Sequence, residues 1–126
     1  MILARAFSWL PALSFLAVNV LADASSPSSP QIAGARYGQA LGAIEICPGA
    51  ALSQKAERLK ASFNGRDLDL FLAQAAKIYN SWKPVIHCVN QNDPNPCRII
   101  IQMSCQAAAA EIGPGGSAFP DLLGLR

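Results

Sequence analysis

The sequence contains few charged side chains and a single histidine. Only 14% of its 126 residues are Asp, Glu, Lys or Arg, and the ten basic side chains are scattered along the chain. Nucleic-acid binding needs clustered lysines and arginines, because they displace the counterions of the phosphate backbone. The composition therefore argues against binding to nucleic acid.

Short motifs of common catalytic and metal sites are also missing. The chain has no G-x-S-x-G stretch and no CxxC pair, and its NQNDPNP segment offers a calcium ion only the carboxylate of Asp93. Asp67 and Asp69 are explained by the favourable placement of negative charge at a helix N-terminus. We therefore expect no catalytic residue, no metal and no cofactor, and we interpret the protein as a non-enzyme.

His87 lies beside Cys88, which raises the possibility of zinc binding or thiol catalysis. A zinc site would combine His87 with Cys88, Cys97 and Cys105, whose spacing is not that of common zinc sites. Adjacent residues rarely place their side chains face to face, and exported cysteines are usually oxidised. Both interpretations are disfavoured.

The N-terminus has the layout of a secretory signal peptide. An uncharged apolar run, residues 6–21, follows Arg5 and ends in small residues. We expect residues 1–22 to be removed by cleavage after Ala22, with cleavage after Ala24 as the alternative.

The rival interpretation of this segment is an uncleaved membrane anchor. The apolar run is shorter than the ~20 residues of a spanning helix, and Pro11 and Asn19 interrupt it. We therefore expect a secreted or periplasmic protein with no stable membrane span after cleavage.

Four cysteines in a small exported chain predict two disulfides. In the chain-entropy model, a Cys88–Cys97 bridge contributes about 2.7 kcal/mol and a Cys47–Cys105 bridge about 4 kcal/mol. The crossed pairing, Cys47–Cys97 with Cys88–Cys105, gives a similar total. Energy therefore does not decide the connectivity.

Geometry favours one pairing. If Cys97 and Cys105 share a helix, their separation is ~12 Å along the axis, beyond the ~7 Å limit of a disulfide. A short connection between antiparallel helices brings its own ends together, which favours Cys88–Cys97 with Cys47–Cys105. The crossed pairing remains the alternative.

Hydrophobic periodicity predicts an all-α fold, a small disulfide-stapled bundle of about four helices. The predicted helices are approximately 32–46, 53–63, 67–83 and 97–111. They form one domain, residues 32–113, between a disordered leader at 23–31 and a loosely docked tail at 114–126.

Capping and breaking residues set these bounds. Ser53 and Asp67 are predicted N-caps, and Pro84 should end or kink the third helix at Lys83. The last helix is apolar nearly all round, which predicts that it is central and the most buried.

The first predicted helix carries glycine at every fourth position, at Gly34, Gly38 and Gly42. Such a stripe lets another helix approach closely. In a soluble chain we prefer chance spacing as its explanation. Near the end of the third helix, Tyr79 and Trp82 follow its apolar periodicity and are predicted core residues.

The segment between Cys88 and Cys97 is predicted to be a rigid turn closed by a disulfide. Asn, Asp and Pro favour turns, and rigidity lowers the ordering cost of binding. The predicted binding loop consists of Asn90, Gln91, Asn92, Asp93 and Asn95.

These features favour a non-catalytic protein-binding module, acting as an inhibitor, adaptor or accessory subunit. We expect its partner to be another exported or envelope protein. The alternatives are a carrier of small apolar ligands, suggested by a possible cavity between helices, and a periplasmic holdase that loosens in acid.

Overall fold

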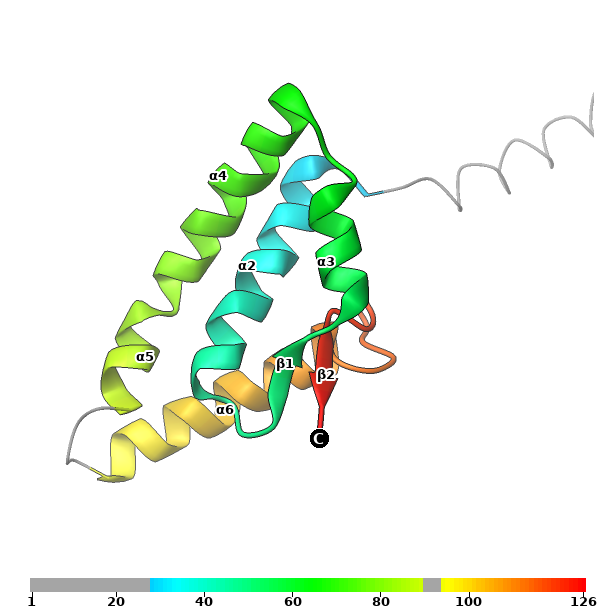
Figure 1. Ribbon diagram of the computed structural model, residues 1–126. Helices are drawn as coiled ribbons and strands as arrows, with labels where there is room; N and C mark the ends of the chain where they lie inside the picture. Colours follow the sequence, from blue (N-terminus) through cyan, green and yellow to red (C-terminus); the bar gives the residue numbers. More distant parts are fainter. Residues whose placement is uncertain (1–27, 90–93) are drawn as a thin grey trace, which may run out of the picture.

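The computed structural model describes residues 28–89 and 94–126, and these form a helical bundle (Figure 1). The predicted all-α, disulfide-stapled fold is confirmed. A two-stranded sheet, which the sequence did not predict, is added to it. In chain order the elements are α2 Pro30–Ile46, β1 Ala50–Leu52, α3 Gln54–Ala61, α4 Gly65–Ser81, α5 Lys83–Val89, α6 Pro94–Ile112 and β2 Leu123–Leu125.

Helix α2 begins earlier than predicted. Its N-cap is Ser29, whose hydroxyl accepts a hydrogen bond from the backbone N–H of Ile32 at 3.2 Å. Pro30 occupies the first turn, where a missing N–H costs little. Residues 30 and 31 are thus helical and do not belong to a disordered leader. The predicted signal peptide, residues 1–22, and leader residues 23–27 lie outside the described residues.

Two other helix boundaries follow local chemistry. Ser53 caps α3 as predicted, because its hydroxyl accepts from the N–H of Ala56 at 3.1 Å. The prediction for Asp67 is wrong: α4 begins at Gly65 after Asn64, and Asp67 lies within its first turn. There the carboxylate still faces the positive end of the helix dipole.

The break between the next two helices lies at Trp82, and Pro84 occupies the first turn of the second one, where a missing N–H costs little. Helix α4 ends at Ser81 and the short helix α5 begins at Lys83. None of the described helices combines the length and the apolar character needed to cross a membrane.

Helix α2, and not α6, is the central helix. It packs against α3, α4, α5, α6 and β1, whereas α6 leaves Ile99, Ile100 and Met103 exposed at 57%, 45% and 64%. The prediction that α6 is the most buried helix is therefore wrong. The mean apolar character of α6 did not reveal whether its apolar side chains are buried or exposed.

The glycine stripe of α2 is a packing surface, so chance spacing is the wrong explanation. Helices α2 and α4 lie side by side (Figure 1), and a Cβ atom at Gly34 or Gly38 would overlap the backbone of Phe71 or Ala75 on α4. A Cβ at Gly42 would overlap the ring of Trp82. Glycine at positions 34 and 38 lets the two helix backbones touch, and glycine at position 42 leaves room for the indole ring.

Aromatic side chains fill the space at the end of this contact where Gly34 faces Phe71. The Phe71 ring is fully buried, with its centroid 5.2 Å from that of Tyr37 and 5.1 Å from that of Phe63. Tilted rings at these separations pack favourably. The small residues of α2 and the aromatic cluster therefore form one continuous core.

The C-terminal segment is anchored more firmly than the predicted loose docking. Strand β2 pairs antiparallel with β1, with Ala51 opposite Gly124. Leu122 and Leu123 are buried, and the N–H of Leu122 donates to the carbonyl of Ile112 at 2.9 Å. The segment thus contributes to the core itself.

We expect Gly38→Ala to lower the free energy of unfolding by about 1 to 3 kcal/mol, because the added methyl overlaps the Ala75 carbonyl. Helix propensity alone would instead raise stability by about 1 kcal/mol. Urea unfolding followed by circular dichroism measures the difference. Ala73→Gly, at an exposed position of α4, is the control for propensity alone. A stabilised Gly38→Ala protein would contradict the close contact.

Candidate functional site

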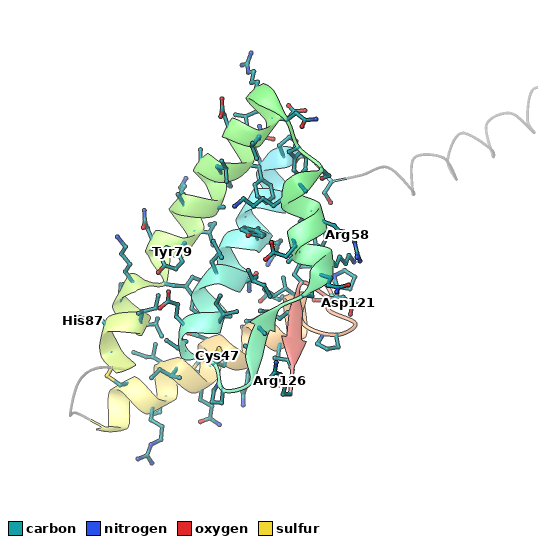
Figure 2. All side chains as sticks on the ribbon, viewed as in Figure 1. Cys47, Arg58, Tyr79, His87, Asp121 and Arg126 are labelled. Atoms are coloured by element: carbon teal, nitrogen blue, oxygen red, sulfur yellow. A yellow bond between two sulfur atoms is a disulfide. The ribbon has the colours of Figure 1, made fainter. Side chains whose placement is uncertain are left out.

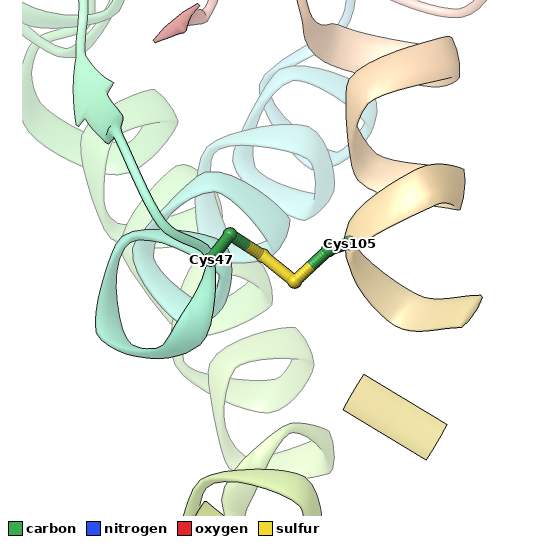
Figure 3. The surroundings of a disulfide bond; sticks show 2 residues. All are labelled: Cys47 and Cys105. Atoms are coloured by element: carbon green, nitrogen blue, oxygen red, sulfur yellow. A yellow bond between two sulfur atoms is a disulfide. The ribbon is translucent and has the colours of Figure 1, made fainter. Parts of the chain in front are cut away.

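Two disulfides join the bundle in the pairing that the sequence favoured. Cys47, at the end of α2, is bonded to Cys105 in the middle of α6, with the Cα atoms 5.6 Å apart (Figure 3). Cys88 of α5 is bonded to Cys97 of α6, with a Cα separation of 5.5 Å. Because stable disulfides form in oxidising environments, these bonds indicate an oxidising compartment.

Disulfide formation also removes the thiolates that a zinc site would use, since all four cysteines are bonded to one another. Within residues 28–89 and 94–126, no three His, Cys, Asp or Glu side chains are grouped closely enough to hold a metal ion. His87 lies on α5 with its side chain exposed (Figure 2).

Most of the predicted binding loop, Asn90, Gln91, Asn92 and Asp93, lies outside the described residues. Asn95 lies in the first turn of α6, since this helix begins at Pro94 rather than at Cys97. The proposed role of the loop in binding therefore stays a prediction.

The described residues contain a groove along α2 and the end of α4, with a volume of about 460 Å³. We call it the α2–α4 groove. Its wall combines apolar side chains with one guanidinium and one amide. The lining residues are Ile32, Ala35, Arg36, Gln39, Ile78 and Trp82.

The glycine contact positions the aromatic part of this groove. Trp82 is the C-cap of α4, and its ring lies against Gly42 of α2. Any side chain at position 42 would push the indole away. Periodicity assigned Trp82 to the core, and the half-buried residue does pack against the core while it also lines the groove.

A hydrogen-bonded network fixes the polar part of the groove. The Arg36 guanidinium donates to Glu111 Oε1 at 2.6 Å and to Gln39 Oε1 at 3.0 Å, and Gln39 Nε2 donates to the same Glu111 oxygen at 3.4 Å. Arg36 and Glu111 are partly exposed, so their ion pair contributes at most about 1 kcal/mol to stability. Its main effect is to hold the guanidinium in one orientation.

A second groove, of about 450 Å³, lies where α6 meets β2 and the end of α2. We call it the α6–β2 groove. The Cys47–Cys105 bridge and aliphatic side chains line it, with Arg126 as its charged residue. The lining residues are Cys47, Pro48, Ile101, Gln102, Cys105, Gln106, Ala109, Leu125 and Arg126.

Tyr79 links α4 to α2 on the surface (Figure 2). Its hydroxyl donates to Glu45 Oε1 at 3.0 Å, and this hydrogen bond to the carboxylate raises the pKa of Tyr79 above 10. For Tyr37, burial and the nearby Glu57 carboxylate likewise raise the pKa. A phenol whose pKa is raised on folding contributes stability that is present at neutral pH. This contribution is lost only as the pH rises through the pKa of the phenol in the folded state. Neither tyrosine therefore titrates near neutrality.

No protein-family model matches the chain, and neither does any curated protein or solved structure. No residue role is therefore transferred from a relative. The function is inferred from the side chains of this chain and their geometry.

We expect loss of the Cys47–Cys105 bridge, by double substitution with alanine, to lower the free energy of unfolding more than loss of Cys88–Cys97. The first bridge closes a loop of 58 residues and the second one of 9. The chain-entropy model gives a difference of about 1.5 kcal/mol. Urea unfolding of the two double variants measures it. Equal losses would show that loop closure does not control their contributions.

Proposed function

We propose that the protein is a non-catalytic binding module of the periplasm or the extracellular space. It binds an apolar segment of another exported protein in the α2–α4 groove. The two disulfides and the signal-like N-terminal sequence support the compartment. The composition and geometry of the groove support the binding role.

The observation that carries this proposal is the combination of Trp82 and Arg36 in one groove with flanking isoleucines. Tryptophan and arginine are enriched among the residues that dominate binding energy at protein interfaces. The indole offers a large apolar surface, while the guanidinium is held in place by Glu111 and Gln39. A site that is already ordered loses little entropy on binding.

The open shape of the groove favours a protein segment over a small molecule. Ile32, at one end, is 59% exposed, so a bound molecule would be covered on one side only. Sites for small ligands usually bury 70–90% of the ligand surface. A helix or extended segment, backed by its own protein, does not need such enclosure.

We expect Ile32→Glu to abolish partner binding without weakening the fold. The substitution removes the Ile32 side chain from the groove and brings a negative charge to its end, while a glutamate at the third position of α2 completes a capping box with Ser29. Tagged protein is incubated with envelope extract from its native host, and co-purified proteins are identified by mass spectrometry. Leu72→Glu is the matched control, because Leu72 is also exposed and apolar but does not line the groove.

The supporting result is a stoichiometric partner retained by the wild-type and Leu72→Glu proteins and lost by Ile32→Glu. Thermal unfolding verifies that Ile32→Glu is at least as stable as the wild type. A partner that binds all three proteins equally would exclude the α2–α4 groove. Recovery of no stoichiometric partner by the wild type would count against the binding function.

The α6–β2 groove supports a second candidate, a carrier of small apolar ligands. Its floor contains a disulfide and aliphatic side chains, and the Arg126 guanidinium offers a partner for a carboxylate. A fatty acid has this combination of an apolar chain and an anionic head.

We expect a carrier to gain thermal stability from added palmitate, since a ligand that binds only the folded state stabilises it. Leu125→Glu places a carboxylate in the groove and should remove this gain. Ile44→Glu, at an exposed apolar position outside the groove lining, should retain it. An unchanged melting temperature of delipidated wild-type protein at saturating palmitate would exclude the carrier function.

A further inference from the structure

The two disulfides lie in differently packed parts of the bundle. Cys105 is followed on α6 by Ala108 and Ile112, which are 1% and 0% exposed and belong to the core. Its partner Cys47 is the C-cap of α2, a helix that packs directly against α6. The surrounding core therefore keeps these two cysteines close to each other even when their bond is open.

The Cys88–Cys97 bridge joins segments that lack such a core. Residues 83–88 of α5 are all half-buried or exposed, and so are residues 97–104 of α6. Helix α5 and the start of α6 lie together at one end of the bundle, away from β1 and β2 (Figure 1). Segments with few buried contacts open at a low free energy. Opening this bond therefore lets its two cysteines move apart.

This difference in packing makes one bridge easier to reduce than the other. Thiols that the fold keeps adjacent have a high effective concentration and re-form their bond, whereas thiols that separate do not. Exposure does not distinguish the two bridges, since all four cysteines are half-buried. The packing thus favours reduction of Cys88–Cys97 before Cys47–Cys105.

Helix α5 connects the Cys88–Cys97 bridge to the α2–α4 groove. It directly follows Trp82, whose carbonyl accepts a hydrogen bond from the N–H of Ile86 at 2.9 Å. The Trp82 ring lies against Gly42 and lines the groove. A change in the position of α5 is therefore transmitted to the aromatic wall of the groove.

We propose that Cys88–Cys97 is a thiol-exchange site whose opening releases α5 and withdraws Trp82 from the α2–α4 groove. The reactant is a thiol, of which glutathione is the simplest probe. The site rests on the proposed function, because it regulates binding in the same groove. The oxidised protein has the ordered groove and binds its partner, and the protein with this bridge reduced does not.

The exchange consumes two molecules of glutathione. The thiolate of the first attacks Cys88 Sγ, the Cys88–Cys97 bond breaks, and its electron pair leaves on Cys97 Sγ. Cys97 lies near the N-terminus of α6, where the helix dipole stabilises the departing thiolate. A second glutathione thiolate attacks the glutathione sulfur of the mixed disulfide, which releases Cys88 and forms glutathione disulfide. The bridge thus gains the two electrons and two protons that the glutathione molecules lose.

The test is a redox titration of the full chain with Trp9→Phe, in which Trp82 is the only tryptophan. The oxidised protein is equilibrated in glutathione buffers of increasing reducing strength. Free thiols are then alkylated, and peptide mass spectrometry identifies the alkylated cysteines. The equilibrium constant for reduction of Cys88–Cys97 should exceed that of the other bridge about tenfold or more.

Acrylamide quenching of Trp82 fluorescence reports the position of the indole in the same samples. Its Stern–Volmer constant should rise over the range in which Cys88 and Cys97 become alkylated, because the indole leaves Gly42 for solvent. The variant Cys88→Ser/Cys97→Ser in the same background should show the raised constant already in oxidising buffer. Circular dichroism verifies that the helices outside α5 persist in this variant.

Reduction of both bridges together, or of Cys47–Cys105 first, would overturn the thiol-exchange site. Earlier opening of Cys88–Cys97 with unchanged quenching of Trp82 would overturn its link to the groove. The titration needs no partner, so its failure is distinct from failure of the binding function, which the co-purification with Ile32→Glu tests.

Discussion

The close contact between α2 and α4 is the constraint on which the remaining structure depends. At Gly34 and Gly38 the two backbones touch, and at Gly42 the Trp82 ring occupies the space of an absent side chain. Shape complementarity holds the two helices together without large aliphatic residues on α2, because dispersion contacts accumulate along the whole helix. The rest of the bundle is arranged around this pair.

Because small residues form this contact, the core is thin. A disulfide and a strand pair tie the remaining segments to it. The Cys47–Cys105 bridge ties α6 to the end of α2, and the β1–β2 pair ties the C-terminal segment to the start of α3. Leu122 and Leu123 then fill space that the helices leave. For a chain of this size, such cross-links supply much of the stability that a larger core would provide.

Because the core is thin, apolar side chains remain exposed in two places. Where α4 ends beside α2, Trp82 and Ile78 remain partly exposed and form a groove with Arg36. On α6, which contacts the bundle along one side, Ile99 and Met103 stay in solvent. The two surfaces have different chemistry. The groove combines apolar side chains with a guanidinium that Glu111 and Gln39 hold in place, whereas the exposed large side chains of α6 are aliphatic or thioether groups.

Features that depend on neighbours in the sequence were predictable. The helical class, the Ser53 cap and a helix break shortly before Pro84 follow from short-range capping and backbone geometry. The disulfide pairing could also be favoured from the sequence, because helix geometry and loop closure limit which cysteines can meet. In each case the decisive interaction lies within a few residues or is covalent.

Features that depend on distant segments were not predictable. The sequence placed α6 at the centre, but α2 lies there, since burial depends on which helix receives neighbours on several sides. Strand β2 pairs with a segment about seventy residues away, and its short sequence has no strand periodicity of its own. The α2–α4 groove required the side chains of two helices in their packed positions.

The sequence by itself thus determined the helices, their caps and the cross-links, because local backbone preferences and thiol chemistry act within the chain. Only the tertiary structure decided which glycines touch another helix and which apolar side chains remain in solvent. Both outcomes depend on the relative placement of whole helices, and hydrophobic burial, being non-directional, does not specify that placement from composition alone.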